Sequence, residues 1–305
     1  MTRPGLPPLP YDEWRETRDS LHLFCQIVGK MRMGAHPKLN HWWHVTLYPD
    51  TRGLTTGRVP CGNGAFRIDL DLLDHVVRVT ANDGRHTGFD IPGLSAAGFL
   101  ERLRTEMKDL GFEVPIVAKP YEHPSTIPFE EDTAPRVYDT EAATRYWQAL
   151  CSIASIFETW RGRFAGKQTP VHLFWHSFDL VVTRFSGRAA PMESENQVER
   201  EAYSHEVVSV GFWPGDAKVR KPAFYAYAYP EPAGLRELAL PHGEIIAQGG
   251  GSLALLDYET MRTAEDPPAV LLDFLDGFYE GAARLGGWEQ AAMAPPHRVE
   301  AVSPA

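Results

Sequence analysis

The dipeptide Trp-His occurs twice in this chain, at Trp43-His44 and Trp175-His176. Each copy is followed eight residues later by Thr-Arg, at Thr51-Arg52 and Thr183-Arg184, so one offset relates both pairs of dipeptides. Tryptophan is rare here, with 8 copies among 305 residues, so a repeated pair at a constant offset favours two copies of one structural unit. We therefore predict an internal duplication.

The residues around the two dipeptides repeat as well. The same offset aligns Gly34 with Gly166, and it aligns three apolar residues of one helical face with three of another: Leu21, Phe24 and Val28 with Ile153, Ile156 and Trp160. A second, larger offset aligns Phe99-Leu100 with Phe274-Leu275 and Leu110-Gly111 with Leu285-Gly286. The expected fold class is α+β, with two related helix–antiparallel sheet–helix units packed as one globular body.

Hydrophobic periodicity gives the positions of the elements. Apolar residues at helical spacing predict helices over 11–33, 95–110, 140–164 and 267–285. Alternating or β-branched runs predict strands over 40–49, 65–71, 75–80, 86–91, 114–117, 204–213 and 223–229, a long strand or bent strand pair over 171–183, and two strands around Ile245 and Leu253. The predicted organisation is a flexible proline-rich arm over 1–10, a first unit over 11–118, a linker over 119–139, a second unit over 140–290 and a disordered tail over 291–305.

Charge and composition exclude several classes of function. The formal net charge is −10, and the longest basic cluster is Lys218-Val219-Arg220-Lys221, so the chain lacks the basic face that nucleic acid requires. No apolar run reaches the roughly 18 residues of a membrane span, and the first ten residues are not a signal peptide. We expect a cytoplasmic protein. Its three cysteines are far apart, which argues against a disulfide framework or a cysteine zinc site.

The first Trp-His dipeptide lies in the strand predicted over 40–49. Alternation of side chains puts Trp42, His44 and Tyr48 on one face, which mixes aromatic and polar groups as a pocket wall does. His44 is therefore a candidate catalytic residue, with Trp42 and Tyr48 as candidate ligand-binding residues. His41 and His44 point to opposite faces of such a strand, so this spacing does not form a metal pair by itself. A purely structural histidine is the alternative.

The second dipeptide precedes a lone carboxylate, Asp179, in an apolar run. Such a group needs a hydrogen bond, an ion pair or a metal ion to offset its lost hydration. Arg184 or a histidine would complete an internal ion pair, and otherwise Asp179 is a candidate catalytic base or metal ligand. Trp175 and Arg184 are candidate ligand-binding residues, and His176 is a candidate metal ligand.

A third candidate region opens the strand predicted over 204–213. Tyr203, His205 and Glu206 precede a largely apolar stretch, which makes His205 and Glu206 candidates for acid–base chemistry. Tyr203 is a candidate ligand-binding residue, and so is Tyr227, which belongs to a ladder of alternating tyrosines. A half-exposed sheet face is the alternative interpretation of that ladder.

Five segments carry a family resemblance: NHWWHVTLYPDTRGLTT, WHSFDLVVTRFSGR, YSHEVVSVGFWPG, FYAYAYPEP and LLDFLDGFYEGAARLGGW. They are similar to segments of a bacterial domain family of unknown function. The resemblance covers residues 11–290 and implies that the whole chain is one such unit. It implies no activity, cofactor or catalytic residue.

Three classes of function compete. The first is a small-molecule enzyme with a His and carboxylate site between the two predicted halves, built from His44, Asp179, His205 and Glu206. A divalent transition metal such as Zn, Fe or Mn would be held there by His44, His176 and His205. Without a metal, the same groups would carry out acid–base catalysis on a hydrolysable or enolisable substrate. The second class is a non-catalytic protein that binds a small molecule in an aromatic cavity, and the third is a structural or interaction protein.

Overall fold

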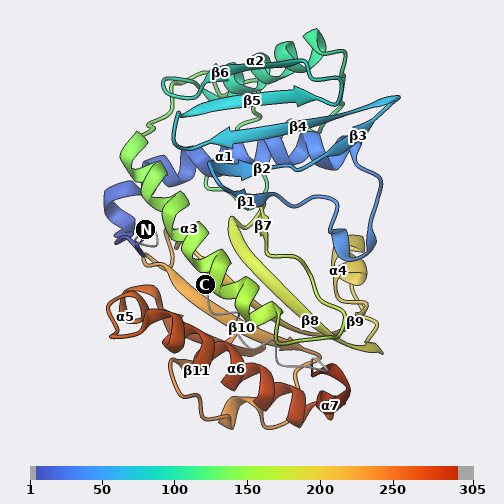
Figure 1. Cartoon of the computed structure of the whole chain (residues 1–305), viewed down its shortest axis with the longest axis vertical. Coiled ribbons are helices and arrows are strands. Elements are labelled where there is room, and N and C mark those ends of the chain that lie inside the picture. The colour runs from blue at the N-terminus through green and yellow to red at the C-terminus, as the bar shows by residue number, and fades with distance from the viewer. Residues whose placement is uncertain (1–4, 295–305) are drawn as a thin grey trace, which may run out of the picture. The chain divides into compact units, whose positions relative to one another are not determined.

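The computed structural model describes residues 5–294 and has an α+β fold, in which helices flank two antiparallel sheets (Figure 1). Four long helices lie where the apolar periodicity predicts them: α1 (Tyr11–Ala35), α2 (Ala96–Asp109), α3 (Thr140–Arg161) and α6 (Pro267–Leu285). Three short helices, α4 (Gln197–Ala202), α5 (Tyr258–Arg262) and α7 (Gln290–Met293), were not predicted. None of the described helices combines the length and apolar character that a membrane span requires.

The helix boundaries follow from capping chemistry. Ser95 precedes α2, and its side chain accepts a hydrogen bond from the Gly98 backbone N–H. Gly111 follows α2 with a φ of +87°, a left-handed conformation that glycine adopts without steric cost. Asp266 caps α6 in the same way as Ser95, by accepting from the Ala269 N–H, and proline opens the helix.

The first sheet contains six strands from the first third of the chain. They are β1 (Tyr48–Asp50), β2 (Gly53–Thr55), β3 (Val59–Cys61), β4 (Gly64–Asp71), β5 (Val76–Ala81) and β6 (His86–Asp90). The order is β1-β2-β4-β5-β6, and β3 pairs with the same strand β4 as β2 does. Alternate residues of β4, namely Phe66, Ile68 and Leu70, are at most 1% exposed, as the sequence pattern predicts. Phe99 of α2 packs edge-to-face on Phe89, at 5.4 Å between ring centres.

The second sheet also contains six strands. They are β7 (His172–Phe174), β8 (Asp179–Ala189), β9 (His205–Trp213), β10 (Ala223–Tyr229), β11 (Glu244–Gln248) and β12 (Gly251–Asp257). The order is β11-β12-β10-β9-β8-β7. The hairpin of β11 and β12 thus lies at one end of the sheet, with β12 rather than β11 next to β10. Gly249 and Gly250 form the turn of that hairpin with φ values of 58° and 85°. Both halves of the chain thus run helix, strands, helix, but the two sheets connect their strands differently.

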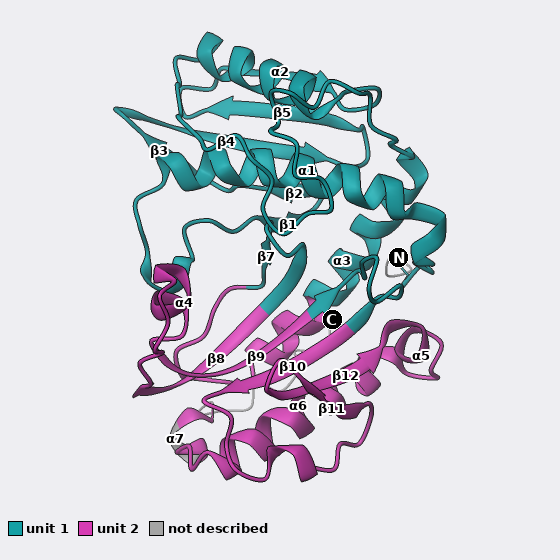
Figure 2. Cartoon of the chain, turned by 180° about the vertical axis from the view of Figure 1, so that it is seen from behind, with its two compact units in different colours: residues 1–154, 171–181, 212–223 teal, residues 155–170, 182–211, 224–305 magenta. Residues whose placement is uncertain are grey.

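Two compact units divide the chain (Figure 2). Unit 1 consists of Met1–Ala154, Val171–Val181 and Phe212–Ala223, and unit 2 consists of Ser155–Pro170, Val182–Gly211 and Phe224–Ala305. Of the predicted arm and tail, residues 1–4 and 295–305 lie outside the described residues. Leu9 of the arm is only 3% exposed, and α7 occupies the start of the predicted tail.

The prediction of a strand around the first Trp-His dipeptide was wrong. Residues Asn40–Trp42 form a short 3-10 turn, and the strand β1 starts only at Tyr48. His41 and Trp42 have φ values of 52° and 61°, and this left-handed backbone breaks the alternation on which the prediction relied. His44 and Trp42 are therefore not on one face of a strand.

The second dipeptide lies in a turn rather than a strand. Residues 175–178 connect β7 to β8, so of the two predicted forms the paired one is correct. Thr183-Arg184 lies inside β8, whereas Thr51-Arg52 forms the turn between β1 and β2. The repeated dipeptides therefore occupy different local structures. The strand predicted over 114–117 is also wrong, since these residues pair with no neighbouring strand among the described residues and Val117 is 66% exposed.

Candidate functional site

A stripe of polar residues runs along the buried length of α1. Arg18, His22, Gln26 and Lys30 follow at intervals of four, which places them on one face of the helix, and their exposure lies between 0% and 6%. Sequence reasoning missed this stripe because the apolar face of α1 was the stronger periodic signal. The i, i+4 spacing of four long polar side chains was the signal that could have revealed it.

The stripe is anchored to a segment without regular structure that follows α2. The Gln26 amide donates to the Tyr121 carbonyl at 2.7 Å and accepts from the Tyr121 N–H at 2.8 Å. The ring of His123 contacts the Asp19 carbonyl through Nε2 at 3.1 Å, while its Nδ1 accepts from the Ser125 N–H. Because the Gln26 amide bonds both the carbonyl and the N–H of Tyr121, it fixes the position of residues 121–123 against α1.

The β7–β8 turn packs on the same helix. The Trp175 indole N–H donates to the Val45 carbonyl at 2.7 Å, and the Lys30 ammonium lies 5.1 Å from the centre of the indole ring. Gly29 permits this approach, because a Cβ at that position would lie 2.1 Å from the Trp175 ring. Phe178 closes the turn with a φ of 61°, which is strained backbone for a bulky residue.

His22 stands where these pieces meet. Its Nε2 lies 3.0 Å from the His176 carbonyl and 3.0 Å from the Gln26 amide nitrogen. Its Nδ1 is buried and has no hydrogen-bond partner among the described residues. Burial lowers the pKa of His22 well below the ordinary value, and the positive charge of Arg18 acts in the same direction. His22 is therefore a neutral imidazole. It packs against the β7–β8 turn by stacking on Phe178, with 4.9 Å between the ring centres.

His176, a predicted site residue, forms a pair with a carboxylate, Glu122. Its Nδ1 lies 3.2 Å from Glu122 Oε2, and the side chains are 32% and 51% exposed. The hydrogen bond from His176 lowers the pKa of Glu122, while burial opposes it. Glu122, like Phe178, has a left-handed backbone, with a φ of 51°. One left-handed residue is thus a member of the pair, Glu122, and the other, Phe178, lies two residues after its partner His176.

This pair has the geometry of an oriented base. A carboxylate that accepts from Nδ1 fixes the tautomer of the imidazole and leaves Nε2 with a lone pair. Such a ring can accept a proton from water or from a substrate, and the carboxylate then stabilises the imidazolium. Sequence reasoning proposed His176 as a metal ligand and missed Glu122, which lies in the predicted linker. The signal there was the tripeptide Tyr121-Glu122-His123.

The other predicted residues of unit 1 lie in separate contacts. His44 is 4% exposed, accepts from the Leu39 N–H through Nδ1 at 3.3 Å and stacks on Trp42 at 5.2 Å. Burial lowers the pKa of His44, and the nearby charges of His36, Arg32 and Lys38 lower it further. Tyr48 lies under the Arg32 guanidinium at 5.4 Å, and Asp179 accepts from the Ser177 hydroxyl.

Arg184 of unit 2 is enclosed rather than presented to a ligand. It is 1% exposed, and its guanidinium lies 3.4 Å from the centre of the Trp160 ring, 5.0 Å from that of Phe164 and 4.4 Å from that of Tyr279. Its Nη2 donates to the Trp160 carbonyl at 2.5 Å. This environment indicates a structural role in the core of unit 2.

The remaining predicted residues belong to unit 2. The hydroxyls of Tyr203 and Tyr227 are 2.9 Å apart, and the Nδ1 of His205 lies 3.1 Å from the Ser204 hydroxyl. Glu206 accepts from Ser186 and Arg188 through Oε2, at 2.7 and 2.8 Å. Within residues 5–294, no group of three or more His, Cys, Asp or Glu side chains is arranged to hold a metal ion.

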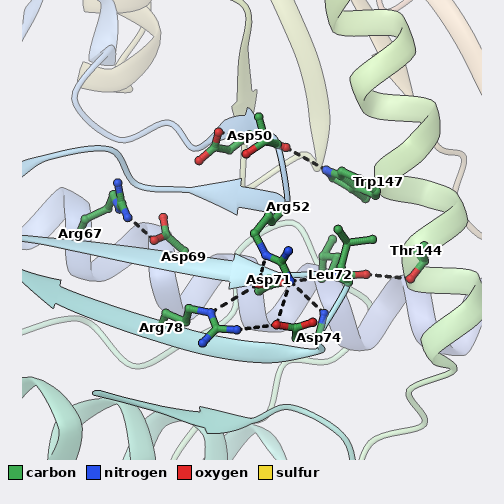
Figure 3. Close-up of polar contacts among 12 residues, drawn as sticks. Asp50, Arg52, Arg67, Asp69, Asp71, Leu72, Asp74, Arg78, Thr144 and Trp147 are labelled. Carbon is green, nitrogen blue, oxygen red and sulfur yellow. Dashed lines mark hydrogen bonds and ion pairs between the residues drawn. The ribbon is translucent and has the colours of Figure 1, made fainter. Parts of the chain in front are cut away.

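Arg52, from the first Thr-Arg dipeptide, takes part in an ion-pair network on the first sheet (Figure 3). Its Nε lies 2.6 Å from Asp71 Oδ2 and its Nη2 lies 2.8 Å from Asp74, and Arg78 contacts the same two carboxylates. Asp71 also accepts from the N–H groups of Leu73 and Asp74. The network joins the β1–β2 turn to the β4–β5 turn, so Arg52 has a structural partner set.

Two cavities of the described residues lie away from the predicted aromatic residues. One is a groove of about 420 Å³ in unit 1, which includes Arg58, Arg67 and Asn82 in its lining. The other is a pocket of about 210 Å³ in unit 2, which includes Glu206. Trp42, Tyr48, Trp175 and Tyr227 line neither of them.

Comparison with known proteins gives one match. A family model described as a family of unknown function, DUF5996, matches residues 6–295. No curated protein and no solved structure shows significant similarity to the chain.

Proposed function

We propose a function for this chain, which belongs to the DUF5996 family of unknown function, from its own residues. The protein acts as an enzyme on a small molecule, with His176 as the general base and Glu122 as the residue that orients the imidazole. The observation that carries this proposal is the contact of 3.2 Å between His176 Nδ1 and Glu122 Oε2 at a position that solvent reaches. The reaction class is proton transfer on a hydrolysable or enolisable substrate.

The surroundings of the pair support this function. The Glu122 and Phe178 backbones are left-handed, which costs about 1–3 kcal/mol at each such residue, and strain of this kind concentrates where geometry must be held for chemistry. The buried stripe of α1 holds both strained segments, through Gln26 on one side and His22 on the other. A base that is fixed in this way needs little reorganisation when it accepts a proton.

The exposed aromatic ring beside the pair offers a surface for the substrate. Tyr121 is 52% exposed, and its ring stands edge-on to His176 at 6.0 Å between centres. A planar or apolar substrate group that packs on Tyr121 would lie next to the imidazole. In this arrangement Tyr121 binds, His176 transfers the proton, and Glu122 stabilises the imidazolium.

The test compares the wild type with His176→Gln and Glu122→Gln. Each protein is incubated with a small-molecule cell extract, and mass spectrometry records which compounds are consumed. We expect the wild type to convert at least one compound, His176→Gln to lose roughly 100-fold or more of that rate, and Glu122→Gln to lose less. His86→Gln is the control, since His86 is an exposed histidine of the edge strand β6. An unchanged rate in His176→Gln would exclude the proposal.

A further inference from the structure

Unit 2 contains a pocket of about 210 Å³ that the function proposed above does not use. One wall comes from β9 and β10 with the segment that follows them, and the other comes from the end of α6 and Trp288. Its lining combines apolar residues, such as Val208 and Leu285, with polar groups. Two carboxylates and two aromatic rings also line the pocket, from Glu206, Glu231, Tyr229 and Trp288.

The two carboxylates of the pocket differ in how many of their oxygens already accept hydrogen bonds. Both oxygens of Glu231 are occupied by Ser252, whose N–H and hydroxyl donate at 2.6 and 2.8 Å. Glu206 receives Ser186 and Arg188 on Oε2, whereas its Oε1 accepts no hydrogen bond within the described part of the chain. Glu206 Oε1 is therefore the acceptor that a ligand can use.

The neighbouring cation, Arg188, is already engaged through each of its three nitrogens. Arg188 donates from Nε to Glu206, from Nη1 to the Gly287 carbonyl at 3.1 Å and from Nη2 to the Gly286 carbonyl at 2.5 Å. Arg188 forms an ion pair with Glu206. Because the pocket has two carboxylates, Glu206 and Glu231, and one guanidinium, its net charge is negative. An anionic ligand would meet repulsion there, and a cationic one attraction.

The aromatic rings favour the same charge. Tyr229 and Trp288 both line the pocket, and the face of an aromatic ring attracts an organic cation, tryptophan most strongly. Because one water molecule occupies about 30 Å³ in the liquid, a pocket of about 210 Å³ accommodates a ligand of roughly seven to ten non-hydrogen atoms.

We infer that this pocket binds a small organic cation, such as a primary or quaternary amine with a short apolar chain. Glu206 Oε1 is the charge partner, and the Tyr229 and Trp288 rings form the walls. This site is independent of the His176–Glu122 pair, because its residues all belong to unit 2.

The test measures binding of choline to the full chain by calorimetry and by the shift of the Trp288 indole N–H resonance, which Trp288→Leu identifies. The comparison probe is the carbon analogue of choline, in which a tert-butyl group replaces the trimethylammonium group. We expect choline to bind the wild type at least about tenfold more tightly than the neutral analogue. Glu206→Gln and Trp288→Leu should each weaken choline binding about tenfold or more, and Glu199→Gln, an exposed carboxylate of α4 outside the pocket, should not.

Three results would overturn the inference. They are no choline binding at millimolar concentration, equal affinity for choline and its neutral analogue, and unchanged affinity in Glu206→Gln. The comparison of the two probes uses the wild type alone, so it decides the question even where Glu206→Gln, which loses the Arg188 ion pair, fails to fold. Loss of the His176-dependent activity leaves this result unaffected, so the two proposals fail separately.

Discussion

Unit 1 buries His22 and unit 2 buries Arg184, each at 1% exposure, and the two basic side chains are accommodated in opposite ways. Burial drives the pKa of His22 downward, so the imidazole is neutral and needs no counter-charge. Burial also lowers the pKa of Arg184, to about 10, but the guanidinium stays charged at neutral pH and is surrounded by three aromatic rings. A titratable base gives up its proton, whereas a permanent cation has to be enclosed.

The difference extends beyond these two residues. Burial lowers the pKa of His22, His44, His75 and His123, all of which belong to unit 1. Histidines whose pKa is lowered in this way can respond to pH or exchange protons with neighbours, whereas a guanidinium enclosed by aromatic rings stays charged. Unit 1 also buries the cations Arg18, Lys30 and Arg32, so it is these histidines that single it out as the place to look for proton chemistry.

The largest expected effect is that of Arg184→Ala. The substitution removes three ring contacts and the hydrogen bond to the Trp160 carbonyl, and it leaves a cavity, so we expect the free energy of unfolding to fall by roughly 3 kcal/mol. Arg184→Met, which keeps the volume without the charge, should cost only about 1 kcal/mol. Urea denaturation measures both. Arg163→Ala is the control, because Arg163 is an exposed arginine of the same unit. Equal losses in the Ala and Met variants would show that the cage needs the charge itself.

Gly29→Ala tests the contact between α1 and the turn of unit 1. A Cβ would meet the Trp175 ring at 2.1 Å, so the turn has to move, and we expect a loss of about 2 kcal/mol by thermal denaturation. Because the same turn holds His176, the activity proposed above should fall as well. Gly162→Ala provides the matched control, since its Cβ would make only ordinary contacts, the shortest at 3.5 Å. Full stability of Gly29→Ala would contradict the close packing.

Acidification should act on unit 1 first. The pKa of His22 lies lower in the folded chain than its unfolded value of about 6.5, so below that pH the unfolded chain binds more protons than the folded one. Stability therefore falls as pH decreases below about 6.5 and is fully present above it, with His22 contributing on the order of 1 kcal/mol for each pH unit. Hydrogen exchange at about pH 7.5 and about pH 5.5 should show lost protection in residues 14–30 before residues 267–285. Simultaneous loss in both segments would remove the contrast between the units.

The smallest expected effect belongs to Arg52→Ala. Arg52 is 50% exposed, and ion pairs in solvent contribute little to stability, so its unfolding midpoint should match that of the wild type within error. Asp71→Ala, in contrast, removes the buried acceptor of two backbone N–H groups and should cost about 2 kcal/mol by urea denaturation. A large loss in Arg52→Ala would show that the network, rather than Asp71 alone, holds the two turns.

Regular periodicity made the long helices and most strands predictable, and irregular backbone made the candidate site unpredictable. The strand β10 and the helix α6 occur over the residues that their patterns indicate, because each has a continuous apolar face. The left-handed residues His41, Trp42 and Phe178 leave no periodic trace in the sequence, so both Trp-His dipeptides appeared to be in strands. Glu122 lies in a segment without secondary structure, and its partner His176 is distant along the chain, so no local pattern relates them.

The predicted duplication has mixed support from the two sheets. Each half begins with a long helix, continues with six strands and reaches another helix. The strand order differs, because β12 lies next to β10 whereas the first sheet follows chain order along its main path. The Thr-Arg dipeptides also differ, with Arg52 in an exposed network and Arg184 in an aromatic cage. Shared ancestry of the halves stays a prediction.

The shortness of the outermost strands has a consequence for behaviour at high concentration. The terminal strands of the two sheets, β1, β6, β7 and β11, contain 3, 5, 3 and 5 residues, and Leu173 of β7 already forms two backbone hydrogen bonds with Leu47, just before β1. A proline in β1 removes one backbone donor, and Glu244 places a charge at the start of β11. Unpaired strand edges are the templates on which chains add to one another, and short, proline-bearing or charged edges offer a poor template. The protein is therefore protected against edge-to-edge aggregation by the same strand lengths that end its sheets.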